Sequence, residues 1–182
     1  AETVLAVAMD ESPRITDAPL RTMATREGEG WVLSGDKQLV IDGQAAEAFL
    51  VAAQDAHDPA SVIWLWVPAN AQGVTTERVA MMDAHPTARI HFAQVSVGAN
   101  ALIASGAPGA QLLASTRDVG RVMTAAELFG VCDEVFARTL DYLKQRKQFG
   151  KLIGEFQALQ HRVAELYCDL ELSRAMVWRG LQ

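Results

Sequence analysis

The residues with the clearest potential for chemistry lie in one short connection, residues 146–157. Positive charge, aromatic rings, amides and a glycine gather there, on Arg146, Lys147, Lys151, Phe149, Phe156, Gln148, Gln157 and Gly150. The planar guanidinium of an arginine can donate two hydrogen bonds to a diphosphate. The connection therefore suggests a site for an anionic ligand that carries a ring. The alternative is a solvated helix end, because cations near a helix C-terminus interact favourably with the helix dipole.

Two helices are expected to position this connection. Apolar residues repeat at helical spacing on both sides of it. The first set is Val119, Val122, Ala126, Phe129, Phe136, Leu140 and Leu143, and the second is Phe156, Leu159, Val163, Leu166, Leu170, Val177 and Leu181. We expect one helix from about residue 109 to 146, a break near Gly150 and an antiparallel second helix. Two helices alone leave apolar surface exposed, which predicts further helices and a homo- or hetero-oligomer, a dimer or tetramer.

Residues 1–104 show the short apolar runs and turn signals of β structure. Strands are expected at residues 31–33, 38–41, 48–52, 62–67, 74–76 and 89–95. Residues 34–37 indicate a hairpin turn between the first two. In the last strand Arg89, His91 and Ala93 share one face, so His91 is expected to be a half-exposed strand residue. The predicted class is α+β: an antiparallel β-barrel-like domain, residues 1–104, then a long antiparallel helical hairpin of a bundle, residues 105–182.

Composition excludes several classes of protein. The chain has 182 residues, half of them hydrophobic, and a net charge of −6. An acidic chain is a poor general binder of nucleic acid. No apolar run reaches the roughly 20 residues that span a bilayer, so no membrane insertion is expected. Residues 1–4 do not resemble a secretion signal, and both ends interrupt a pattern, which suggests a fragment of a larger protein.

The cysteines and histidines point to no metal site. Cys132 and Cys168 lack metal-type spacing, and the four histidines are scattered. We expect both cysteines to be buried, reduced thiols in a reducing, cytoplasmic compartment.

The connection at residues 146–157 resembles the Arg-Lys-x-Phe-Gly-Lys-x-Ile-x-x-x-Gln signature of the acyl-CoA dehydrogenase family. The run from Asp118 through Arg121 to Gly130 is similar to the helical run that precedes this signature. Three other segments resemble parts of the family's middle β domain. They are residues 10–13, at the place of its Thr-Glu-Pro, residues 30–37 and residues 92–97.

This resemblance implies an FAD-dependent oxidoreductase that acts on the Cα–Cβ bond of an acyl-CoA substrate. In the family a glutamate removes the α-proton, and the β-hydrogen leaves as a hydride to the flavin. The resemblance implies that Asp118 and Arg121 line the acyl-CoA cleft, although Arg121 alone fits an interhelix ion pair equally well. It also implies contact with the ADP half of an FAD, held mostly by a neighbouring subunit, for Arg146, Gln148, Phe149, Phe156 and Gln157.

The chain departs from the family on the side of the flavin ring. Leu39 stands where the family has an aromatic residue, and Ile41 where it has a hydroxyl residue. Residues 14–18 replace an expected Gly-x-Gly-Ser-Asp segment. Gly120 occupies one of the family's two positions for the catalytic glutamate, and the other would lie beyond Gln182. No catalytic residue is therefore assigned in this chain, and the fragment alone is expected to be inactive.

Three interpretations remain open. The chain could be part of a complete acyl-CoA dehydrogenase whose catalytic base lies elsewhere. It could be a non-catalytic subunit of a mixed assembly that completes a partner's FAD site. It could also be an interaction module without a cofactor, but that interpretation gives no reason for the match across residues 146–157.

Overall fold

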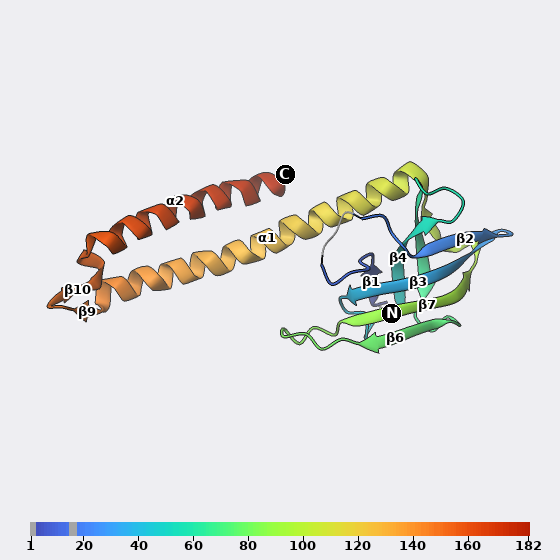
Figure 1. The fold of residues 1–182 in the computed structure, drawn as a ribbon, viewed down its shortest axis with the longest axis horizontal. Coiled ribbons are helices and arrows are strands. Elements are labelled where there is room, and N and C mark those ends of the chain that lie inside the picture. Colours follow the sequence, from blue (N-terminus) through green and yellow to red (C-terminus); the bar gives the residue numbers. More distant parts are fainter. Residues whose placement is uncertain (1–2, 15–17) are drawn as a thin grey trace. The chain divides into compact units, whose positions relative to one another are not determined.

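A computed structural model describes residues 3–14 and 18–182. The chain divides into two compact units, Ala1–Ser115 and Thr116–Gln182. The first is rich in β-strands and the second is helical (Figure 1). The expected α+β class is confirmed. The expected domain boundary at residues 104/105 stays a prediction. Residues 14–18 were expected to replace a Gly-x-Gly-Ser-Asp segment of the family. Most of this segment, residues 15–17, lies outside the described part of the chain.

The first unit is built on one eight-stranded sheet. Its strands are β1 (Leu5–Ala8), β2 (Met23–Glu27), β3 (Gly30–Val40), β4 (Ala48–Asp55), β5 (Val62–Pro68), β6 (Val74–Arg78), β7 (Ala88–Val97) and β8 (Leu102–Ala104). The pairing order is β6-β7-β3-β2-β4-β5-β8, with β1 also paired to β4. A short 3-10 helix, η1 (Ala99–Ala101), precedes β8.

Two expectations about this sheet are corrected. The sheet is not wholly antiparallel, because β1 and β2 both pair with β4 in parallel. Hydrogen bonding within the described residues does not close it into a barrel, since the end strands β6 and β8 do not pair with each other. The parallel pairing is possible because β4 offers two separate stretches of its length: it pairs with β1 through residues 48–51 and with β2 through residues 54–55.

The core of this unit follows from strand alternation. In β7 the side chains of Ala88, Ile90 and Phe92 are buried, whereas those of Arg89, His91 and Ala93 face outward, as expected. The rings of Phe49 and Phe92 meet edge to face, with centroids 6.4 Å apart. Strands β4 and β5 are buried along most of their length, which explains why their sequences read as nearly continuous apolar runs.

The expected hairpin turn at residues 34–37 is wrong. These residues lie inside β3, a strand of 11 residues. Gly35 adopts a φ of 142°, and its bare α-carbon lets Thr22 approach closely, so the glycine serves close packing within the strand. The hairpin that does form joins β2 to β3 through Gly28 and Glu29, where Gly28 supplies the positive φ of 59°.

The helix α1 (Gly106–Gln145) begins against the sheet of the first unit. The indole Nε1 of Trp64 donates a hydrogen bond to the carbonyl oxygen of Gly109 at 3.0 Å, and both Trp64 and Leu113 are buried. A Cβ atom at Gly109 would collide with the carbonyl oxygen of Val62 in β5. The start of α1 is therefore fixed by a contact that only a glycine permits.

The second unit is a helical hairpin. Figure 1 shows α2 (Gln157–Gly180) running back alongside the second half of α1. The rings of Phe136 and Tyr167 lie 6.2 Å apart, and Arg174 of α2 forms an ion pair with Asp133 of α1 at 3.1 Å. The two expected helices are confirmed. Among the described residues, no helix combines the length and apolarity that a membrane span requires.

The cysteines differ from expectation. Cys132 and Cys168 are both exposed and free, whereas buried thiols were expected. Cys132 lines the groove between α1 and α2, which stays open to solvent. Much other apolar surface is open on the hairpin, including Val119 of the expected apolar stripe.

We predict opposite effects for alanine at two glycines of α1. Gly109→Ala should lower the free energy of unfolding by about 2 kcal/mol, because overpacking forces the backbone of β5 or α1 to move. Gly120→Ala is the matched control, since its Cβ would meet no atom within 4 Å. It should raise stability by about 0.5–1 kcal/mol through helix propensity. Urea unfolding of both variants tests this, and equal stabilities would contradict the packing argument.

Candidate functional site

The cationic corner, defined as residues 146–157, joins the two helices through a miniature hairpin. Strands β9 (Lys147–Gln148) and β10 (Lys151–Leu152) pair in antiparallel register, and a single-turn 3-10 helix, η2 (Ile153–Glu155), leads into α2. The amide of Arg146 still donates to the carbonyl of Tyr142 at 2.9 Å, and the amide of Ile153 donates to the carbonyl of Arg146 at 2.8 Å. The corner is therefore an ordered structure.

The turn of this hairpin is held in an unusual backbone conformation. Phe149 has a φ of 53° and Gly150 a φ of 81°. Two successive positive φ values define the tight type I′ turn, which normally takes asparagine followed by glycine. A phenylalanine at the first position is strained, because a left-handed conformation crowds its Cβ against the backbone. Strained residues of this kind are often found at functional sites.

Aromatic rings form the exposed surface of the corner. Phe149 is 92% exposed, and its ring meets that of Phe156 edge to face, with centroids 6.3 Å apart. The ammonium of Lys151 lies 4.3 Å from the centre of the Phe156 ring. An exposed phenylalanine in a strained conformation does not stabilise an isolated chain. The geometry therefore indicates a surface that binds a ring-bearing ligand or another chain.

The charged and amide groups of the corner are also available. Arg146, Lys147, Gln148 and Gln157 are exposed. Within the described part of the chain, neither Arg146 nor Lys147 forms a salt bridge. The side-chain amide of Gln148 donates only to the carbonyl of Lys147, at 2.8 Å. The corner thus presents positive charge, donors and aromatic faces together, which is the chemistry that an aromatic diphosphate requires.

The other predicted substrate residues lie far from this corner. Asp118 and Arg121 both project from α1, and the Arg121 guanidinium pairs with the Asp118 carboxylate at 3.0 Å. This pair lies within one helix, and the interhelix ion pair considered for Arg121 stays a prediction. Arg121 and Arg146 are separated by roughly 37 Å along α1, because an α-helix rises about 1.5 Å per residue. One copy of the chain cannot bring the two groups to one small ligand.

The segment expected to face a flavin ring offers only apolar side chains. Leu39 is half-buried and has a φ of 50°, and Ile41 is 61% exposed. Neither side chain can donate a hydrogen bond. On α1, a Cβ at Gly120 would meet no other atom within 4 Å, so the absence of a side chain there is not required by packing.

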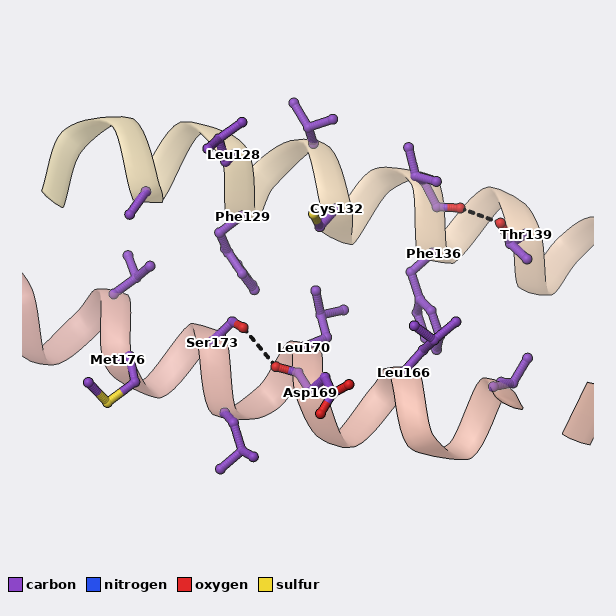
Figure 2. Close-up of a pocket in the computed structure, with 16 residues that line it drawn as sticks. Leu128, Phe129, Cys132, Phe136, Thr139, Leu166, Asp169, Leu170, Ser173 and Met176 are labelled. Atoms are coloured by element: carbon purple, nitrogen blue, oxygen red, sulfur yellow. Dashed lines mark hydrogen bonds between the residues drawn. The ribbon is translucent and has the colours of Figure 1, made fainter. Parts of the chain in front are cut away.

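A groove between α1 and α2 was not predicted as a site. Figure 2 shows Phe129 and Phe136 of α1 pointing toward α2, where Leu166 and Leu170 lie opposite. The groove has a volume of about 800 Å3 and an almost wholly apolar lining. The hydroxyls of Thr139 and Ser173 donate to carbonyls of their own helices, so they offer no donor to a ligand. The groove is therefore a surface for packing against other apolar groups. The sequence pattern that could have predicted it is the apolar stripe on each helix.

Comparisons with known proteins agree with this architecture. The model of the acyl-CoA dehydrogenase middle domain matches residues 7–95, and that of the acyl-CoA dehydrogenase C-terminal domain matches residues 108–182. Long-chain specific acyl-CoA dehydrogenase from mouse mitochondria is 32% identical over 97% of this chain and 43% of its own length. The chain belongs to the acyl-CoA dehydrogenase family, and it spans less than half the length of this relative.

Solved structures show the same likeness. An acyl-CoA dehydrogenase from Geobacillus kaustophilus superposes with a TM-score of 0.82 and 29% identity over 97% of this chain and 49% of its own. A structure described as an FAD-dependent dehydrogenase gives a TM-score of 0.84 and 26% identity over 98% of this chain and 51% of its own. Both neighbours are named as dehydrogenases, and one of them as FAD-dependent.

We predict that relieving the strain at Phe149 stabilises the corner. Phe149→Asn creates the Asn-Gly pair that a type I′ turn favours, and it should stabilise the turn by about 1 kcal/mol. Phe149→Ala is the matched control, because it also removes the ring but keeps a side chain that disfavours positive φ. Hydrogen exchange of the amides at residues 147–152 should be slower in the asparagine variant than in the alanine variant. Equal exchange in the two would count against strain at this turn.

Proposed function

We propose that this chain is part of an FAD-dependent acyl-CoA dehydrogenase, which oxidises the Cα–Cβ bond of an acyl-CoA thioester. The observation that carries this proposal is the cationic corner, with its exposed cations and its strained, exposed phenylalanine. The family membership supports it. Because the chain spans less than half the length of its relatives, the activity belongs to the proposal and concerns the whole protein.

The corner fits the ADP half of FAD. In this proposal Arg146 donates to the diphosphate with its planar guanidinium, and the amides of Gln148 and Gln157 supply further donors. Phe149 and Phe156 provide ring faces for the adenine. FAD, when bound, supplies the hydride acceptor of the reaction. The residues of this chain hold the nucleotide end of the cofactor and contribute no proton transfer.

The separation along α1 supports a shared site for the corner. Asp118 and Arg121 are proposed to face the acyl-CoA, whereas the corner binds nucleotide roughly 37 Å further along the helix. The corner therefore completes the FAD site of a neighbouring subunit. Such sharing predicts an oligomer, a dimer or tetramer of like or unlike subunits. The exposed apolar faces of the hairpin support this proposal, because they need covering by further helices or chains.

We predict that Arg146→Ala weakens FAD retention by the assembled protein. Losing a charged hydrogen bond to a phosphate costs about 1.5–3 kcal/mol, which corresponds to about tenfold or more in affinity. Arg138→Ala is the control, because Arg138 lies on the same helix but pairs with Glu134 at 2.7 Å. The measurement is the flavin dissociation constant of each purified assembly. Equal dissociation constants for Arg146→Ala and the wild type would contradict a role of the corner in binding FAD.

A second candidate is favoured by the apolar side chains on the flavin-ring side. Leu39 and Ile41 offer no aromatic or hydroxyl contact, and Gly120 provides no carboxylate. We propose as the alternative that the chain is a non-catalytic subunit, which lends its corner to the FAD of an active partner and holds little flavin itself.

The flavin content of the purified complex separates the two candidates. A non-catalytic subunit predicts one FAD for every two subunits in an assembly of unlike chains, and loss of that flavin on Arg146→Ala. A complete enzyme predicts one FAD for every copy of this chain when it is purified alone at full length, together with dehydrogenase activity on an acyl-CoA. Absence of flavin from both preparations would reject both candidates.

A further inference from the structure

A fully buried lysine lies at the centre of the described sheet unit. The side chain of Lys37 in β3 is 0% exposed, and its ammonium donates to a carboxylate oxygen of Glu11 at 2.7 Å. The same ammonium donates to the carbonyl of Met9 at 3.2 Å. A buried ammonium needs such partners, because removal from water is costly for an unpaired charge. Lys37 therefore ties the middle of β3 to residues 9–11.

Glu11 is held from several sides. One carboxylate oxygen accepts from the amide of Thr22 at 2.8 Å, and the other accepts from the amide of Arg21 at 2.6 Å. Burial alone would raise the pKa of the Glu11 carboxyl. The hydrogen bond and charge of Lys37, with the bonds from Thr22, instead lower this pKa from 4.5 to about 2. The group is thus a carboxylate at neutral pH, and Glu11 and Lys37 form a charged brace between three chain segments.

The brace lies at the start of a β-bulge. Lys37 pairs with Ile90 of β7, and the next pair is Val40 with Ala88, so β3 holds one extra residue between these pairs. The strain of the bulge falls on Leu39, which has a φ of 50°. Beside it, the amide of Gln38 donates to the carbonyl of Asp10 at 2.8 Å. The two segments that the brace joins are therefore also hydrogen-bonded to each other next to the bulge.

We infer that Glu11 and Lys37 are positioning residues, whose buried pair fixes the bulged conformation of residues 38–41 and with it the surface presented by Leu39 and Ile41. The inference rests on the proposed function, in which this surface lies against the flavin ring. It deepens that proposal by assigning the shape of the surface to two residues that do not themselves face the ligand.

Energetics favour this role over simple stabilisation. A buried ion pair contributes little net stability, because desolvation of both charges offsets much of their attraction, and apolar side chains of similar size often serve as well. A pair of buried charges does, however, penalise any register that separates them. In a strand with an extra residue, that penalty selects one register among neighbouring ones.

The test uses the full-length protein in its natural assembly. The variants are Lys37→Met, Glu11→Gln and the double variant Glu11→Gln/Lys37→Met, which removes both charges. Arg138→Met is the control, because Arg138 forms an exposed ion pair with Glu134 at 2.7 Å on α1 and, among the described residues, has no contact with the bulge. The readouts are the thermal midpoint, hydrogen exchange of residues 36–42 in flavin-free protein, and the absorption spectrum and dissociation constant of bound flavin.

Lys37→Met should speed exchange of residues 36–42 by about tenfold or more, as local opening becomes easier, and should shift the flavin spectrum. Glu11→Gln, which keeps the lysine and a hydrogen-bonding partner, should do so more weakly. Lys37→Met should lower the thermal midpoint, and the double variant should restore it toward the wild-type value. The double variant should restore neither the slow exchange nor the wild-type flavin spectrum. Arg138→Met should change none of these readouts.

Two results would overturn the inference. One is recovery of exchange and flavin spectrum together with stability in the double variant, which would reduce the pair to a structural ion pair. The other is unchanged exchange at residues 36–42 in Lys37→Met. If the wild-type assembly binds no flavin, the proposed function fails, and the exchange pattern alone then decides whether the pair positions the strand. Should Lys37→Met fail to fold, the same comparisons between Glu11→Gln and Arg138→Met decide whether the pair positions the strand.

Discussion

The unbroken run of α1 between Asp118 and Arg146 is the constraint on which the functional interpretation depends. An α-helix satisfies each interior amide with the carbonyl four residues earlier, so it fixes the distance between two points on its surface. Gly120 and Gly130 lie inside this run and weaken it locally, but neither interrupts the helix. Charged groups at its two ends therefore cannot converge on one ligand within a chain. Any site that needs both must be built from more than one copy or more than one kind of chain.

The helical hairpin is held by a few specific contacts and little apolar packing. Arg174 combines an ion pair with Asp133, a second with Glu171 at 3.2 Å and a position over the Phe129 ring, 4.8 Å from its centre. These interactions set the register of α2 against α1 while leaving the groove between them largely open. Partly exposed ion pairs contribute little stability. The hairpin is consequently better suited to receive further helices than to stand alone.

Much of the architecture could be predicted from the sequence because burial and periodicity agree. Strands β4, β5 and β7 carry clear apolar patterns, and the two helices carry long apolar stripes. The corner was found because its residue types are adjacent in the chain. The predicted roles of Asp118, Arg121 and the corner residues remain predictions that only binding experiments can test.

The errors have physical causes of their own. Ser34, Gly35 and Asp36 have the composition of a turn, but Gly35 is used for a close approach to Thr22. The parallel pairing of β1 and β2 with β4 depends on contacts between distant segments, which no local pattern encodes. The Glu11–Lys37 brace escaped notice for the same reason, since nothing in the spacing of the two residues indicates that they meet. Burial of the two cysteines was wrongly expected because both lie within helical patterns, and such a pattern does not show how much of the hairpin stays open to solvent.

The pairing of β3 with β7 also determines how the protein can be made. Trp31 pairs with Val97, so this part of the sheet depends on contacts between residues that are far apart in the chain. Such topologies fold slowly, because loop closure costs entropy before the contacts form. During synthesis, β3 cannot pair with β7 until β7 has left the ribosome. The apolar faces of β4 and β5 are exposed until then. The nascent chain is therefore most vulnerable to aggregation before residue 97 emerges, and a chaperone that shields β4 and β5 would act in that interval.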